Sequence, residues 1–377
     1  MTFGWMGTLL LNRYFTPMLM KSSFFSKTGI LDTENKNTTI INKTEKVVVG
    51  EDRSATEIAS GAVYAVVDVY SFLPEEKKTL VKTSDNEDAQ KKYTQGKKGT
   101  GTILTNDGII VTHKNNIIEE GADYKILTFD GAVLDASLLG IDEFTELAFL
   151  KADGANLTTI PFANSDDVNS GRKVIALGGL TGDKKISLAD GVLTELDENF
   201  NLSGAEVASS EKLEGVFRMN FSGGENYVGG PVINYNGELL AISSAIKIDN
   251  EMNYFQIPAN AVRDAMQKAV ENRLEESANL GIYYISLNPY YKNLKGLTTD
   301  KGALVYSASG KQGLAVVAGS AAEKSGIKIN DIIVSIDGNE INSSHPLSDF
   351  ISQYEKGSTA TMNILRAGEL MEITVEF

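Results

Sequence analysis

Short apolar runs of β type, separated by Gly, Asn and Asp, dominate residues 55–258, and residues 61–72 are the first such run. Two of the separators, Asn106-Asp107-Gly108 and residues 234–237, have the composition of tight turns between apolar runs, so they predict β-hairpins. Strands at this spacing, with turn signals between them, are typical of a sandwich or a barrel. The pattern therefore predicts a mostly β domain over most of the chain.

The pattern changes after Pro258. Apolar residues then recur at helical spacing and predict a helix over 259–279 that connects two domains; they are Val262, Ala265, Met266, Ala269, Val270 and Leu274. Short strands return in residues 280–377, with one helical stretch at 346–354. The second domain is therefore expected to mix strands and helices.

The N-terminal segment fits neither a spanning helix nor a secretory signal. Residues 1–25 are apolar but are interrupted by Arg13 and Pro17, so we expect a membrane anchor or its remnant, or else a buried or disordered tail. Residues 26–54 are polar and indicate a linker. Residues 74–98 mix Lys with acids without an apolar period, which indicates an exposed loop between two strands.

Composition excludes several kinds of function. A length of 377 residues allows two to three domains, and 42% hydrophobic residues can fill their cores. The net charge of −15 disfavours nucleic acid as a partner. With no Cys, and with His113 and His345 as the only histidines, neither a thiol nucleophile nor a multi-histidine metal site can form. No phosphate-binding glycine loop occurs, and we expect no metal and no organic cofactor.

Three segments, in order, resemble those that surround the triad of HtrA-type trypsin-like serine proteases. They are residues 99–112 (GTGTILTNDGIIVT), 140–151 (GIDEFTELAFLK) and 229–238 (GGPVINYNGE). Residues 161–178 and 255–258 also fit that family, and residues 319–338 resemble its PDZ domain. The resemblance implies a trypsin-like double β-barrel at 55–258, a connecting helix at 259–279 and an α+β PDZ domain at 280–377.

The resemblance places unsuitable residues at the catalytic positions. The base position is Asn115, the position of the orienting Asp is Glu146, and the nucleophile position is Val228. Asn226 stands where the family usually has an oxyanion-hole glycine. Because an amide cannot accept a proton near neutral pH and valine has no nucleophilic atom, we expect the acyl-enzyme mechanism to be lost.

Neighbouring residues offer an alternative. An active serine endopeptidase could use non-standard residues, for example Ser222 paired with Lys114. His113 lies two residues before the base position, too far along an extended strand to replace it, and we expect it in an exposed loop. We expect Glu146 to be a surface or rim carboxylate and Val228 to fill a pocket. His345 is expected to cap or flank the helix that follows it.

The PDZ domain keeps a groove that can bind peptide. By resemblance, backbone N–H groups of Leu280, Gly281 and Ile282 would hold a terminal carboxylate, because PDZ grooves bind extended peptides by strand addition. Tyr283 and Ile285 would continue the pairing strand, while Leu347 and Ile351 would line the side-chain pocket. These last four residues could equally be ordinary core of a small domain.

The resemblance thus implies a pseudoprotease that binds unfolded or C-terminal peptide segments in envelope protein quality control. Family members often form trimers, so the chain itself, or an active relative, is a further expected partner. An extracytoplasmic location, with anchoring through the N-terminus, also follows from the resemblance.

Overall fold

The computed structural model describes residues 54–73, 96–181, 185–204 and 207–377. The predicted anchor at 1–25, nearly all of the linker at 26–54 and residues 74–95 of the charged stretch lie outside these ranges. Within the ranges, no helix is both long enough and apolar enough to span a bilayer.

The first described element is a helix, which corrects the prediction of a strand beginning at residue 61. Helix α3 (Ala55–Ala62) begins at a capping box, in which the Ser54 hydroxyl accepts from the Glu57 N–H and the Glu57 carboxylate accepts from the Ser54 N–H. A short 3₁₀ turn, η2 (Val63–Ala65), follows, and the strand begins at Val66. The cap and the alanines favour helix over the β-type residues that come next.

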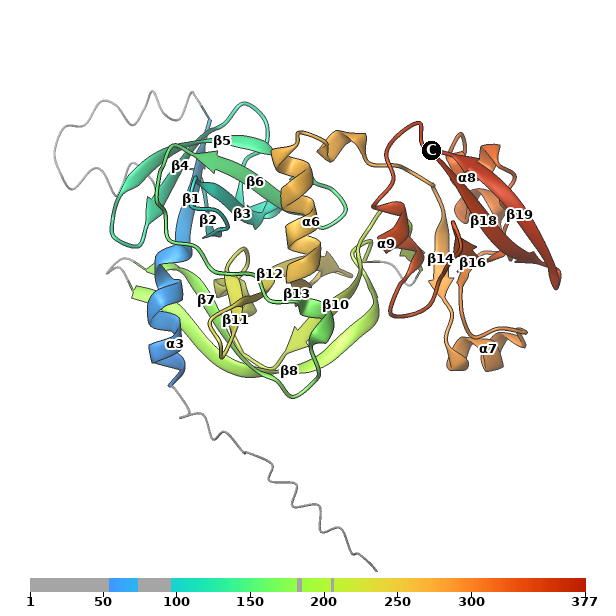
Figure 1. Cartoon of the computed structure of the whole chain (residues 1–377), viewed down its shortest axis with the longest axis horizontal. Coiled ribbons are helices and arrows are strands. Elements are labelled where there is room, and N and C mark those ends of the chain that lie inside the picture. The colour runs from blue at the N-terminus through green and yellow to red at the C-terminus, as the bar shows by residue number, and fades with distance from the viewer. Residues whose placement is uncertain (1–53, 74–95, 182–184, 205–206) are drawn as a thin grey trace, which may run out of the picture. The chain divides into compact units, whose positions relative to one another are not determined.

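Two closed six-stranded barrels follow (Figure 1), confirming the predicted double barrel. The first barrel has the order β1-β2-β3-β6-β5-β4, and its strands are β1 (Val66–Phe72), β2 (Lys97–Ile103), β3 (Ile109–His113), β4 (Asp123–Thr128), β5 (Val133–Asp142) and β6 (Leu147–Ala152). The second barrel has the order β10-β13-β12-β11-β7-β8, and its strands are β7 (Lys173–Thr181), β8 (Lys185–Asn201), β10 (Glu214–Met219), β11 (Pro231–Asn234), β12 (Leu239–Ile248) and β13 (Glu251–Pro258). Short 3₁₀ turns lie between strands at η3 (Lys114–Asn116), η4 (Ser165–Asp167) and η5 (Gly224–Asn226).

Both predicted hairpin turns are present. In the first, the Leu104 N–H donates to the Ile109 carbonyl at 2.8 Å, and Gly108 adopts φ +102°. In the second, the Asn234 N–H donates to the Glu238 carbonyl at 2.9 Å. Backbone with positive φ is accessible to glycine at little cost, which explains the turn sequences.

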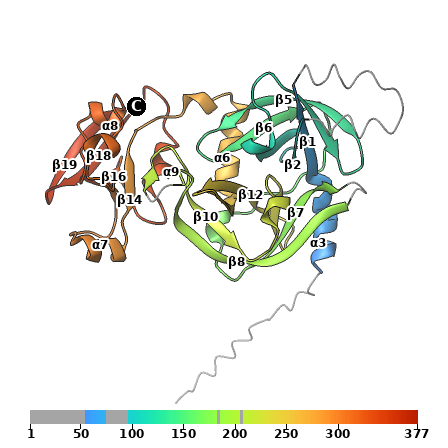
Figure 2. The same cartoon turned by 180° about the vertical axis from the view of Figure 1, so that it is seen from behind.

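The predicted connecting helix is shorter than expected and packs on the barrels (Figures 1 and 2). Helix α6 (Ala259–Val270) ends nine residues before the predicted end, and the turn η6 (Leu274–Glu276) follows. Val262, Ala265 and Ala269 are buried in one apolar cluster with residues of both barrels. The apolar period of this segment therefore records packing against the double barrel.

The C-terminal domain contains a sheet in the order β19-β18-β16-β15-β14-β9, with β17 paired to β16. Its elements are β14 (Tyr283–Ser286), α7 (Pro289–Lys295), β15 (Ala303–Val305), η7 (Gln312–Leu314), α8 (Ala321–Lys324), β16 (Ile332–Ile336), β17 (Asn339–Glu340), α9 (Leu347–Ile351), β18 (Thr359–Arg366) and β19 (Glu369–Glu376). Strand β9 (Ala208–Ser209) comes from the connection between β8 and β10 of the second barrel. A segment of the barrel domain therefore completes one edge of this sheet.

Candidate functional site

The loop before β11 contains the predicted nucleophile and oxyanion positions. Val228 is half-buried, so it fills its surroundings less completely than expected, and the buried residue of this loop is Tyr227. The Asn226 N–H donates to the Gly223 carbonyl at 3.0 Å within the turn η5. That N–H is therefore engaged with the backbone and does not point freely toward a substrate oxygen.

The predicted base position lies in the turn η3, directly after β3. Asn115 is exposed, whereas the next residue, Asn116, directs its amide toward the nucleophile loop and donates to the Val228 carbonyl at 2.9 Å. The same amide lies 3.0 Å from the Thr112 hydroxyl. Counting along the sequence from Thr112 gives Asn115 as the base position, whereas in the folded chain it is Asn116 that contacts the Val228 carbonyl. Neither asparagine can serve as a general base.

His113 lies at the end of β3 and is only 1% exposed, which corrects the expectation of an exposed loop residue. Burial lowers the pKa of its imidazole to about 4, outweighing the opposing charge of Glu146. Nδ1 accepts the Asn115 N–H at 3.1 Å, so Nε2 carries the proton, and nothing among the described residues accepts a hydrogen bond from it. This histidine is a neutral core residue rather than a base.

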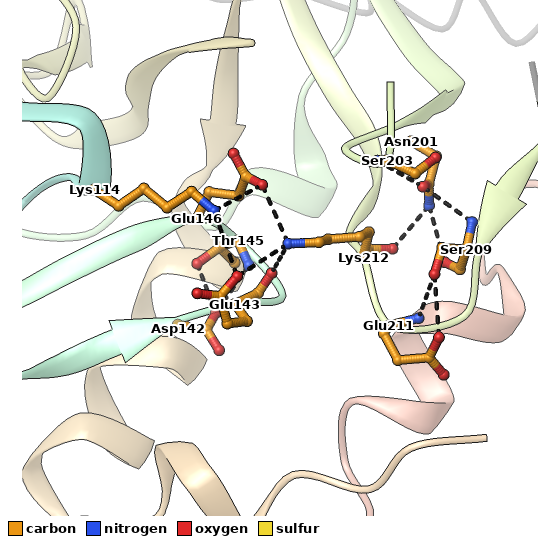
Figure 3. A network of polar contacts seen from close by, with 10 residues as sticks. All are labelled: Lys114, Asp142, Glu143, Thr145, Glu146, Asn201, Ser203, Ser209, Glu211 and Lys212. Atoms are coloured by element: carbon orange, nitrogen blue, oxygen red, sulfur yellow. Dashed lines mark hydrogen bonds and ion pairs between the residues drawn. The ribbon is translucent and has the colours of Figure 1, made fainter. Parts of the chain in front are cut away.

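Glu146 belongs to a partly buried network of ion pairs (Figure 3). Its carboxylate lies 3.1 Å from the ammonium groups of both Lys114 and Lys212, and its side chain is 13% exposed. Glu143 contacts the same two lysines at 3.4 and 3.3 Å. Asp142 is buried below them and accepts hydrogen bonds from the backbone and hydroxyl of Thr145. Glu146 is therefore neither a free rim carboxylate nor an orienting group for a histidine.

The lysine of the alternative serine–lysine pair is fully protonated in this network. Burial alone would lower the pKa of Lys114, but the charges of Glu146 and Glu143 and their hydrogen bonds raise it above its ordinary value. A general base needs the opposite shift. Ser222 is exposed in the loop after β10. The described contacts thus give Ser222 no activating partner in Lys114.

The predicted carboxylate-binding loop contacts the barrel segment that contains β9. The Gly281 N–H donates to Oε1 of Glu211 at 2.8 Å, and the Ile282 N–H donates to the Ser210 hydroxyl at 3.1 Å. Gly281 adopts φ +76°, a conformation that glycine tolerates best. The carbonyl of Leu280 accepts from the Ala322 N–H, so that residue also faces the start of α8.

The remaining predicted groove residues lie on β14 and α9. Leu347 and Ile351 are fully buried in one cluster with Leu280 and Ile282. Tyr283 and Ile285 lie in β14 and pair with the neighbouring strands of the sheet; their partners are Ser209 and Leu304 respectively.

His345 precedes α9 without capping it. Its N–H donates to the Asn342 side chain at 3.0 Å, and Pro346 occupies the N-cap position of the helix. His345 therefore flanks the helix, one of the two roles expected for it.

These features define a class of protein: a trypsin-like peptidase domain followed by a PDZ domain. Residues 99–242 match the trypsin-like peptidase domain family, and residues 278–377 match the PDZ domain family.

Curated relatives narrow the class. A probable periplasmic serine endoprotease, DegP-like, from Rhizobium meliloti is 28% identical over 74% of this chain and 52% of its own length. The periplasmic serine endoprotease DegP of Escherichia coli is 27% identical over 74% of this chain and 56% of its own. The Do-like serine protease HtrA of Bacillus subtilis is 27% identical over 81% of this chain and 69% of its own length. The chain belongs to the HtrA family, and it spans about half the length of the first two relatives.

Solved structures agree on the fold. The HtrA-type protease AlgW with a tripeptide superposes with a TM-score of 0.65 at 21% identity, covering 86% of this chain and 96% of AlgW. AlgW with a decapeptide gives a TM-score of 0.61 and covers 86% of this chain and 98% of AlgW. These likenesses bear on architecture alone.

Proposed function

We propose that this HtrA-family protein is a pseudoprotease that binds unfolded or C-terminal peptide segments through its PDZ groove. The observation that carries the proposal is the nucleophile position, where Val228 offers no atom that can attack a carbonyl. The amides of Asn115 and Asn116, the neutral buried His113 and the ion-paired Lys114 support it, because none can activate a hydroxyl group.

The groove supports the binding half of the proposal. Strand β14 pairs with β15 on one side and only with the two-residue strand β9 on the other, the N–H groups of Gly281 and Ile282 are directed at acceptors, and Leu347 and Ile351 lie in one apolar cluster with Ile282. Such a groove binds an extended peptide by strand addition and holds its carboxylate through backbone N–H groups.

We further propose that the protein acts outside the cytoplasm in protein quality control, because the relatives from Rhizobium meliloti and Escherichia coli are named as periplasmic endoproteases. Partners of the proposed function are peptide segments, a second copy of the chain in a trimer, or an active relative.

Casein hydrolysis tests the catalytic half. The native chain is compared with two triple variants. One carries Val228→Ser, Asn115→His and Glu146→Asp, and the other carries Asn116→His in place of Asn115→His. We expect no cleavage by the native chain from a folded sample. Cleavage that persists after removal of trace contaminants, and that is lost in Ser222→Ala, would establish the alternative, an endopeptidase with non-standard residues.

A further inference from the structure

The peptide-binding edge of β14 is already paired. Strand β9 runs antiparallel to it, with Ser209 opposite Tyr283 and Ala208 opposite Tyr284. The Ser210 N–H continues the pairing by donating to the Ile282 carbonyl at 3.1 Å. This is the backbone pattern of strand addition, made by the chain's own residues.

The end of this segment enters the carboxylate-binding loop as the end of a peptide would. Oε1 of Glu211 accepts the Gly281 N–H, and it also accepts the Ser210 hydroxyl at 2.6 Å. The Ser210 hydroxyl in turn accepts the Ile282 N–H. A side-chain carboxylate and a hydroxyl thus satisfy two of the N–H groups that would otherwise hold a main-chain carboxylate.

Side chains of the segment are buried against the PDZ domain. Ser210 is fully buried, and Ala208, 7% exposed, belongs to the apolar cluster that contains Ile282, Leu347 and Ile351. The segment therefore covers the backbone edge of β14, and its Ala208 belongs to the same apolar cluster as the proposed pocket residues.

The other side of the segment is fastened to the barrels (Figure 3). Asn201 accepts the Ser209 N–H and donates to the carbonyls of Ser209 and Lys212. The Lys212 ammonium lies 3.1 Å from the Glu146 carboxylate. The Leu213 N–H donates to the carbonyl of Phe144, in the turn between β5 and β6 of the first barrel, at 3.0 Å. The degenerate triad carboxylate thus helps to position the residues that fill the groove.

We propose that residues 207–211 occupy the PDZ groove as a built-in ligand, and that peptides with a free C-terminal carboxylate bind by displacing them. This inference rests on the proposed peptide-binding function. A tethered ligand acts at an effective concentration in the millimolar range, so it weakens the apparent affinity for a free peptide.

The contact that the segment makes favours an anionic terminus as the competitor, because a carboxylate, that of Glu211, already accepts the Gly281 N–H. The pocket beside Glu211 is lined by Lys268 and Lys356 and also by Asp142 and Glu143, so its charges balance once Glu211 leaves. Ile351 gives this pocket an apolar wall that suits an aliphatic last side chain. The competing ligand is therefore a peptide that ends in a small aliphatic residue with a free carboxylate.

The absence of cysteine from the chain allows a clean locking experiment. Tyr283 directs its N–H and carbonyl toward Ala315 and Tyr306, on the side away from β9, so Ser209 and Tyr283 form a non-hydrogen-bonded pair. Cα atoms in such pairs lie about 4.5 Å apart, within the range that a disulfide bridges. The variant Ser209→Cys with Tyr283→Cys is therefore expected to form a disulfide that locks the segment in place.

Binding is measured by fluorescence anisotropy with a fluorescein-labelled peptide, Ser-Gly-Ala-Glu-Val-Ala-Ser-Val, as the free acid and as the amide. The free acid is expected to bind the reduced double-cysteine variant and to lose at least about 10-fold in affinity on oxidation. A release variant, Ser210→Ala with Glu211→Ala, is expected to bind at least about 10-fold more tightly than the native chain, and Glu195→Ala, which removes an exposed carboxylate from β8, is expected to match the native chain. The amide is expected to bind more weakly than the acid throughout.

The outcomes separate the two proposals. Failure of the disulfide to form under mild oxidation in the folded chain would overturn self-occupancy and leave peptide binding standing. Equal affinity of the oxidised and reduced forms for the free acid would do the same. If the disulfide forms but no variant binds the peptide, the peptide-binding function fails, and displacement fails with it.

Discussion

Glu214→Gln tests the contact that joins β10 of the barrel to the PDZ domain. Glu214 is 4% exposed and accepts the Tyr284 hydroxyl at 2.5 Å, and that hydroxyl accepts the Ser348 N–H at the start of α9. Burial raises the pKa of Glu214 to about 7 from an ordinary value of 4.5, although the Tyr284 hydrogen bond lowers it. A difference of that size corresponds to roughly 3 kcal/mol of free energy.

The direction in which stability changes with pH follows from the raised pKa of Glu214. The contribution of Glu214 to stability is fully present below about pH 4.5 and is lost as the pH rises through about 7, because the buried carboxylate must then carry a charge. Asp349, whose pKa is raised to about 7 by burial and by the charges of Glu214, Asp166 and Asp264, acts in the same direction. Docking of the PDZ domain on the barrel is therefore expected to weaken from pH 5 to pH 9.

Urea unfolding at several pH values measures this loss. Between pH 5 and pH 9 the native chain is expected to lose on the order of 3 kcal/mol more free energy of unfolding than Glu214→Gln, which stays neutral and keeps an acceptor for Tyr284. Glu195→Gln, at an exposed site, serves as the control and is expected to follow the native chain. Parallel pH profiles for Glu214→Gln and the native chain would refute the reasoning.

Three further predictions concern backbone, core and histidine. Gly229→Ala is expected to unfold the nucleophile loop, because at φ +88° the added Cβ would meet the Thr100 carbonyl oxygen at 2.2 Å. Gly237→Ala, at φ +82° but with open space around it, is expected to lower the free energy of unfolding by only about 1 kcal/mol, as measured by thermal unfolding. Leu347→Ala, at a buried site, is expected to lower the free energy of unfolding by about 2–5 kcal/mol, whereas Leu314→Ala, at a site that is 58% exposed, is expected to lower it by under about 1 kcal/mol. Equal losses for the two variants in denaturant unfolding would contradict the packing. An NMR titration should give His113 a midpoint near pH 4, so its stabilising effect is lost as the pH falls from about 6.5 through 4, and a midpoint near 6.5 would show it to be solvated.

The fold could be predicted largely from local signals. The turns at 106–108 and 234–237 and the motifs around Glu146 and Val228 are short-range features, and the structure places them in the predicted double barrel. The helix over residues 55–62 was missed because its signal is a single capping box ahead of strong β-formers. The end of α6 at Val270 was missed because an apolar period gives no direct stop signal.

The site was predictable only in part, because its decisive contacts join residues far apart in sequence. Nothing near residue 208 in the sequence indicates that Ala208 and Ser209 pair with β14, some 75 positions later. The burial of His113 likewise depends on the strands packed around β3 rather than on its polar neighbours. A two-residue strand with Ser and Glu beside it has no distinctive pattern of its own.

Labelling with a fluorophosphonate tests most directly whether the barrel has kept its acyl-transfer chemistry. These reagents form a stable adduct with an activated serine hydroxyl, and intact-mass spectrometry of the folded chain detects it. Because Val228 stands at the predicted nucleophile position and the neighbouring base candidates are neutral or ion-paired, we expect an unmodified mass after prolonged exposure. A stoichiometric adduct, mapped by peptide fragmentation to Ser222 or to any other serine of the barrels, would contradict it.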